Sequence, residues 1–238
     1  MRSLILGEGQ IGSSVANVIS RDDEVIVFDK KGGEPPIVKA VDILHICFPC
    51  WDAETFVLIV EEYIQMYQPM HVLIWATVPI GTTKLIRGAV HSPVEGRHPE
   101  LSLSIKSMVR WLGVNDAEEG YFFEMYFKKL QMRTRTVQSS NFTEALKLLS
   151  TTEYGINLVF ADYKAKVAKE IGMEYDLTKE WNRDYNKLYH NIHMSDRFQK
   201  FVLDAPGGYI GGHCVVPNAK LLYEQFPDMI VKLVEDMG

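Results

Sequence analysis

The sequence predicts an α/β protein in which a doubly wound parallel sheet is followed by a helical domain built on one long central helix. In the first half, short apolar runs alternate with segments whose apolar residues recur three and four positions apart, as in buried parallel strands joined by helices. In the second half, one periodic segment covers residues 141–172, which is enough for a helix that crosses a whole domain. We therefore expect two domains, 1–138 and 139–238.

The first domain contains five candidate strands, with helices expected between them at about 10–20 and 52–67. The connection over residues 30–41, "KKGGEPPIVKAV", is too short and too rich in Gly and Pro for a full crossover helix. We expect a loop or a reduced helix there. The strand candidates are "SLILG" (3–7), "EVIVFD" (24–29), "DILHICFP" (42–49), "HVLIWATVP" (71–79) and "VRWLGV" (109–114).

The second domain begins with the long helix, for which Asn141 or Thr143 is the expected cap and Gly172 the expected C-terminal glycine. The aromatic and charged segment 175–191 is predicted to be helical. From Asn218 onward, the tail predicts one closing amphipathic helix.

The composition excludes several classes of protein. The formal net charge is −6 and no dense Lys/Arg cluster is present, so we expect no nucleic-acid partner. No apolar run reaches membrane-spanning length, and the first glycine loop begins too early for a signal peptide, which predicts a cytoplasmic protein without a membrane partner. Three cysteines, Cys47, Cys50 and Cys214, suit a reducing compartment and leave Cys214 free to react. We assign no metal site.

The motif "GEGQIG" stands between a predicted strand and a predicted helix. Glycines there permit a tight turn and a close approach to a pyrophosphate, while the helix N-terminus offers N–H donors. Asp29 ends the next strand, where a carboxylate can bind the ribose hydroxyls of NAD. This order predicts a Rossmann-type NAD site rather than a glycine-rich turn of another α/β protein, although Lys30 and Lys31 could tolerate the 2′-phosphate of NADP. The cofactor-binding candidates here are Gly7, Gly9, Gln10, Ile11, Gly12 and Asp29.

The stretch "CFPC" has the spacing of a redox dithiol. It follows a strand instead of opening a helix in a thioredoxin-like pattern, so we interpret it as a loop beside the nicotinamide. Pro49 in this loop is a further cofactor-binding candidate.

Five stretches together resemble the UDP-glucose/GDP-mannose dehydrogenase family of nucleotide-sugar 6-dehydrogenases. They are "ICFP", "ATVPIGTT", "SPVEG", "TEALKLLSTTEYGINLVF" and "GGYIGGHC", in the order of that family and over nearly the whole chain. The "GGHC" form is similar to the UDP-N-acetylhexosamine branch. The resemblance implies an NAD-dependent enzyme that oxidises the primary alcohol of a small-molecule substrate such as a nucleotide sugar. It also implies a homodimer formed through the central helix.

The resemblance further implies roles for single residues. Cys214 matches the nucleophile that attacks the aldehyde from a first hydride transfer, giving a thiohemiacetal that a second transfer turns into a thioester. Lys147 matches the lysine that stabilises developing oxyanions. Thr77 matches the hydroxyl that helps to place water or the sugar, and it also borders the cofactor.

Three positions depart from the family pattern. Thr151 stands where the family has Asn, Asn218 stands where it has Asp, and Glu95 is offset by one position from the carboxylate after "SP". Asn218 keeps hydrogen bonding without a negative charge, so His213 is a candidate base beside Cys214. The substrate-binding candidates are Glu95, Thr151, Gly211, Gly212 and His213, beside the catalytic candidates Cys214, Lys147, Asn218 and Thr77.

The family also has a third, C-terminal domain that grips the nucleotide, and we expect it to be lacking from this chain. Either a separate chain supplies it, or the substrate is smaller, or the reaction has been lost. Two alternative functions therefore stay open. One is a single-step hydroxyacid-type dehydrogenase in which Cys214 is idle, and the other is a degenerate protein that binds NAD without turnover.

Overall fold

The computed structural model describes residues 1–96 and 99–238. These residues form two compact units, Met1–Lys147 and Leu148–Gly238. The expected domain boundary at 138/139 coincides with the end of the last strand, whereas the two units divide within the long helix.

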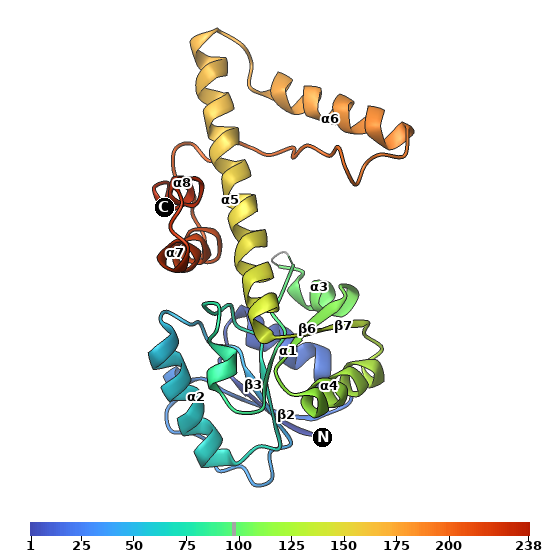
Figure 1. The fold of residues 1–238 in the computed structure, drawn as a ribbon, viewed down its shortest axis with the longest axis vertical. Coiled ribbons are helices and arrows are strands. Elements are labelled where there is room, and N and C mark those ends of the chain that lie inside the picture. The colour runs from blue at the N-terminus through green and yellow to red at the C-terminus, as the bar shows by residue number, and fades with distance from the viewer. Residues whose placement is uncertain (97–98) are drawn as a thin grey trace. The chain divides into compact units, whose positions relative to one another are not determined.

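The first unit is built on a seven-stranded sheet in the order β2-β1-β3-β4-β5-β6-β7 (Figure 1). All neighbouring strands are parallel except β5 and β6, which pair antiparallel. The predicted α/β class with a doubly wound parallel sheet is confirmed, with the β5–β6 pair as an antiparallel exception. The three residues of β5 are too few for a periodic signal in the sequence. The strands are β1 Arg2–Leu6, β2 Glu24–Phe28, β3 Ile43–Ile46, β4 His71–Ile74, β5 Ala89–His91, β6 Arg110–Val114 and β7 Thr134–Gln138.

Helices cover both faces of this sheet, as a doubly wound fold requires. Side chains alternate along β1, so that Ile5 joins one apolar core while Leu4 and Leu6 join the other. Helices α1, α3 and α4 contribute to the first core and α2 to the second, on opposite sides of the sheet in Figure 1. The reduced helix expected after β2 is the short turn η1. The helical elements are α1 Gln10–Ile19, η1 Lys30–Gly32, α2 Ala53–Tyr67, η2 Thr83–Leu85, α3 Leu101–Ser107 and α4 Ala117–Lys129.

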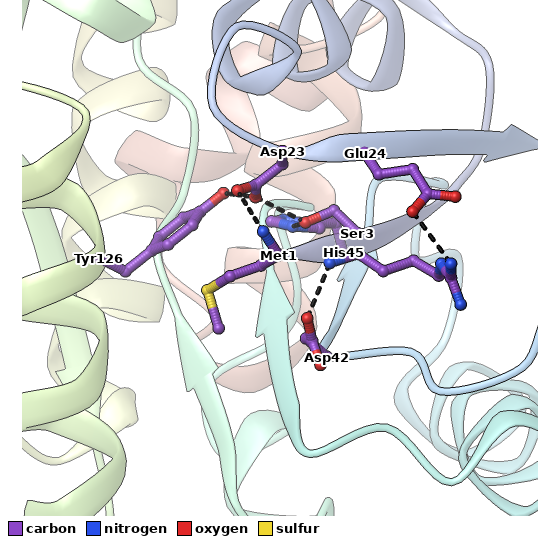
Figure 2. A network of polar contacts seen from close by, with 8 residues as sticks. Met1, Ser3, Asp23, Glu24, Asp42, His45 and Tyr126 are labelled. Atoms are coloured by element: carbon purple, nitrogen blue, oxygen red, sulfur yellow. Dashed lines mark hydrogen bonds and ion pairs between the residues drawn. The ribbon is translucent and has the colours of Figure 1, made fainter.

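A chain of buried hydrogen bonds runs through this unit from β4 toward β1 and α4. Trp75 Nε1 donates to His45 Nδ1 at 3.0 Å, so the ring proton lies on Nε2, which donates to Ser3 Oγ at 3.2 Å. Ser3 in turn donates to Asp23 at 2.9 Å, and the Tyr126 hydroxyl donates to the same carboxylate at 2.8 Å (Figure 2). Burial lowers the pKa of His45 to about 3, so this histidine is neutral. The network holds the end of β4, directly before the "ATVPIGTT" loop, against the centre of the sheet.

The long helix is α5, Ser140–Glu170. Asn141 and Thr143 do not cap it, because the helix begins at Ser140 and Ser139 Oγ accepts a hydrogen bond from Asn141 N at 3.3 Å. The predicted C-terminal glycine is confirmed. Gly172 has φ +71°, and Met173 N bonds back to Ala168 O at 2.8 Å.

Three further helices complete the second unit: α6 Asp176–Asn191, α7 Val215–Gln225 and α8 Met229–Glu235. The single closing helix expected from Asn218 is wrong, since α7 and α8 are separate. Pro227 disfavours helical geometry at the residue before it, and Phe226 has φ −137° and ψ 77°. Both helices pack on α5 at Gly155, where an added Cβ would lie 2.5 Å from Val234 and 2.8 Å from Val215.

Candidate functional site

The glycine loop after β1 has a geometry that only glycine allows. Gly7 has φ +101°, and a Cβ added there would lie 2.9 Å from the backbone N of Phe48. A Cβ on Gly12 would lie 1.8 Å from the carbonyl oxygen of Gly7, so α1 approaches the strand end as closely as its backbone permits. Gly9 is the N-cap of α1 and supplies no side-chain cap. Exposed Gln10 and half-buried Ile11 follow in the first turn, where backbone N–H groups can meet an anion.

Asp29 is tied to this loop at the end of β2. Its carboxylate accepts hydrogen bonds from Glu8 N and Lys31 N, both at 3.0 Å. These two bonds, first that of Glu8, lower the pKa of Asp29, with a further contribution from the charge of Lys31. The carboxylate is therefore ionised at neutral pH, and a negative charge beside the loop repels a 2′-phosphate.

The strand order locates the crevice beside the loop. β1 lies between β2 and β3 in the sheet. After β1 the chain forms β2 on one side of it, and the chain then forms β3 on the other side. Dinucleotides bind at such a switch point, outside the carboxyl ends of the strands. A ribose bound to Asp29 would place the adenosine half of NAD over β2 and the nicotinamide half over the ends of β3 and β4. Pro49 is exposed in the loop after β3, and Thr77 is half-buried in the loop after β4.

Cys47 and Cys50 are free thiols on the β3 side of this crevice. Both are buried, and burial raises the pKa of Cys47 well above its usual range. Burial, with the charges of Asp52 and Glu144, raises the pKa of Cys50 to about 12. The Cys50 thiol donates to Asp52 O at 3.3 Å. Two protonated, buried thiols agree with loop residues beside a cofactor and not with a reactive dithiol.

Lys147 and Glu95 are brought together in the first unit. The Lys147 Nζ lies 3.5 Å from Glu95 Oε1, and only 12% of the Lys147 side chain is exposed. The segment that carries Glu95 is fixed to buried Arg110, which donates to the carbonyl oxygen of Ser92 at 3.0 Å. The Arg110 guanidinium also lies over the ring of Trp75. The candidate lysine and the candidate carboxylate thus form one polar cluster.

Two buried residues that the sequence analysis missed join the "ATVPIGTT" loop to the first turn of α5. His91 Nε2 donates to Ala76 O at 3.1 Å, which leaves Nδ1 to accept from Thr143 Oγ1 at 2.8 Å. Burial lowers the pKa of His91 to about 3, so the ring stays neutral. Glu144 accepts from two backbone N–H groups of the same loop. A histidine before "SP" and a glutamate within a polar helix carry no sequence signal that distinguishes them from surface residues.

In the second unit, the glycine-rich loop before α7 takes its shape from backbone freedom. Gly207, Gly208 and Gly212 have φ values of +76°, +90° and +98°, and open space surrounds the positions of their missing side chains. Gly208 N donates to the buried carboxylate of Asp162 on α5 at 2.8 Å. Gly211, Gly212 and His213 are exposed on this loop.

Cys214 is the exposed N-cap residue of α7. Asn218, one turn later, is buried and donates from Nδ2 to Thr151 Oγ1 at 3.2 Å. The two positions at which this chain departs from the family's Asn and Asp therefore contact each other.

The site candidates fall into two groups. The first unit holds the glycine loop, Asp29, Thr77 and the Lys147–Glu95 pair, and the second holds Thr151, Asn218 and the loop that ends at Cys214. The units divide directly after Lys147, so a meeting of Lys147 with Cys214 remains a prediction.

No protein-family model matches the chain, and no curated protein matches its sequence. Solved structures do match. A UDP-D-ManNAc dehydrogenase from Pyrococcus horikoshii aligns with a TM-score of 0.78 and 19% identity over 100% of this chain and 69% of its own. A UDP-glucose dehydrogenase from the hyperthermophilic archaeon Pyrobaculum islandicum aligns with a TM-score of 0.73 and 16% identity over 99% and 67%. The 3-hydroxyisobutyrate dehydrogenase of Mycobacterium tuberculosis aligns with a TM-score of 0.68 and 11% identity over 99% and 91%.

These matches confirm the resemblance to nucleotide-sugar dehydrogenases at the level of the fold. The chain spans about two thirds of the two sugar dehydrogenases. Within residues 1–96 and 99–238, no helix has both the length and the apolar character that crossing a membrane requires.

Proposed function

We propose that this protein is an NAD-dependent dehydrogenase that oxidises a primary alcohol, with a nucleotide sugar as the substrate class. The observation that carries the proposal is the ionised Asp29, hydrogen-bonded to the glycine loop at the switch point of the sheet. Gly7 and Gly12 let the loop and the start of α1 pack closely on the strand ends, and the open space around Gly9 would admit a pyrophosphate. The fold shared with three dehydrogenases supports the same reaction class.

The residues of this chain then divide the chemistry between them. NAD, when bound, supplies the hydride acceptor. Lys147, next to Glu95, is placed to stabilise the alkoxide formed as the substrate hydroxyl loses its proton. Transfer of a hydride from the alkoxide carbon to NAD would leave an aldehyde, and the Cys214 sulfur would add to its carbon to give a thiohemiacetal. Transfer of a second hydride to a second NAD would give a thioester, which water would hydrolyse to the acid and the free thiol. The Thr151–Asn218 pair orients the first turn of α7, on which Cys214 lies.

Two alternatives keep specific support. The match to a 3-hydroxyisobutyrate dehydrogenase favours a single-step oxidation in which Cys214 is idle. The replacement of the family's Asn and Asp by Thr151 and Asn218 favours a protein that binds NAD without turnover. Counting the NADH formed per substrate molecule separates the three functions: two for the cysteine route, one for the single-step route and none for the degenerate protein.

We expect Asp29→Ala to weaken NAD binding by about tenfold, because the variant loses a charge-assisted hydrogen bond to the ribose and an anchor of the glycine loop. Isothermal titration calorimetry with NAD measures this directly. Glu34→Ala, which removes an exposed carboxylate from the loop after β2, is the matched control and should leave the affinity unchanged. Equal NAD affinities of wild type and Asp29→Ala would refute the assignment of the acid.

We also propose a homodimer formed through α5. This helix leaves six large apolar side chains exposed, spread along its length: Phe142, Leu146, Leu149, Tyr154, Phe160 and Tyr163. Light scattering at micromolar concentration should give the mass of a dimer, and Leu149→Glu should shift it toward the monomer because the interface would bury a charge. A monomeric wild type would count against the proposal.

A further inference from the structure

Glu144 is a buried carboxylate for which the proposed reaction has no use. Its side chain lies in the first turn of α5 and is fully shielded from solvent. Oε2 accepts from Gly81 N at 2.6 Å and Oε1 accepts from Thr83 N at 2.7 Å. Hydrogen bonds from N–H groups to a carboxylate are about twice as strong as neutral ones. The two carboxylate oxygens therefore fix the loop after β4 at two backbone positions.

The same helical turn also holds the beginning of that loop. Thr143, the neighbour of Glu144, contacts His91, and His91 donates to the carbonyl oxygen of Ala76. Gly113 makes room for this turn on β6, since a Cβ there would lie 2.1 Å from Thr143 Oγ1. Residues 76–83 are thus fixed at both ends to the start of α5, with Thr77 between the two anchors.

Glu144 also lies near the second loop that borders the nicotinamide half of the crevice. Its negative charge contributes to the raised pKa of Cys50, in the loop after β3. One carboxylate therefore acts on both the loop after β3 and the loop after β4. Asp29 lies on the other side of β1, at the end of β2.

We propose that Glu144 is a positioning residue that shapes the nicotinamide half of the cofactor site. By fixing residues 76–83 to α5, Glu144 sets the position of Thr77 relative to Lys147. Lys147 follows Glu144 by one turn of the same helix. This inference rests on the proposed NAD site. It assigns Glu144 no contact with the adenosine half.

Glu144→Gln tests the inference with two ligands. The amide group turns one accepting oxygen into a donor that faces a backbone N–H, which breaks one anchor at nearly constant side-chain volume. Calorimetric titration should show NADH binding about tenfold weaker, while ADP-ribose, which lacks the nicotinamide, should bind within about twofold of wild type. Glu153→Gln makes the same chemical change at an exposed position of α5 and should alter neither affinity.

Equal losses of affinity for NADH and ADP-ribose would show that the substitution damages the whole site. Unchanged NADH affinity would show that the contacts of Glu144 do not shape the nicotinamide half. Either result overturns the inference. If Glu144→Gln does not fold, Glu144→Asp keeps the charge but reaches only one N–H group, and the same two criteria apply to it. A wild-type protein that binds neither ligand would overturn the NAD site itself. That failure is visible before any variant is measured.

Discussion

Replacing Cys214 by serine is expected to abolish formation of the acid product, with a loss of at least about a thousandfold in its rate. A serine hydroxyl is a weaker nucleophile than a cysteine thiol, and Asn218 provides no negative charge to activate it. We expect Cys214 and not the buried Cys47 or Cys50 to take this role, because Cys214 is exposed at the N-cap position of α7. The measurement is NADH production and product identity with a panel of nucleotide sugars and small primary alcohols.

Cys50→Ala is the control for this experiment, because Cys50 is buried and protonated and should not take part in the chemistry. The wild type and Cys50→Ala should both form two NADH per substrate. Cys214→Ser should stop after one at most. Two NADH per substrate from Cys214→Ser would contradict the cysteine route, because the second oxidation would then not need the Cys214 thiol.

Acid is expected to destabilise the first unit strongly below pH 6.5, because His45 and His91 are buried and neutral. Burial lowers the pKa of each to about 3, against an ordinary value of 6.5. Such a histidine binds a proton when the protein unfolds, so its stabilising contribution is complete above about pH 6.5 and is lost as the pH falls toward 3. Between pH 6.5 and 5 the two together should lower the free energy of unfolding by about 3 kcal/mol.

Urea denaturation at a series of pH values measures this loss. His91→Gln should be less stable than wild type at pH 7 and should show a flatter dependence of stability on pH, since one titrating group is gone. His190→Gln, which removes an exposed histidine of α6, should keep the wild-type slope. An equally steep slope in His91→Gln would mean that other groups cause the acid sensitivity.

The sequence predicted those parts of the fold that have a strong local signal. The β1–α1–β2 order with its glycines and acid, the long helix α5 and its C-terminal glycine all follow from periodicity and from residues with special backbone preferences. The antiparallel β5–β6 pair could not be predicted in this way, because strand direction depends on how the chain returns to the sheet rather than on a local pattern.

The geometry of the candidate site divides in the same way. Gly7 and Gly12 have backbone surroundings that only glycine fits, and the Asp29 carboxylate hydrogen-bonds the loop between them, so their residue types carry a signal. Glu144 and His91 act through burial and through contacts with residues far away in the sequence. Nothing in a window of neighbouring residues distinguishes a buried glutamate from a solvated one. The contact between Thr151 and Asn218 was likewise hidden, because 67 positions separate the two residues.

A crystal structure of the protein with NAD bound tests the central claim most directly. The account predicts the pyrophosphate on the glycine loop after β1, the adenosine ribose on Asp29 and the nicotinamide over the ends of β3 and β4. It also predicts that Lys147 Nζ and Cys214 Sγ both lie within about 5 Å of the space beside the nicotinamide C4, where an alcohol carbon would react. NAD bound elsewhere, or a Cys214 thiol far from the nicotinamide, would contradict it.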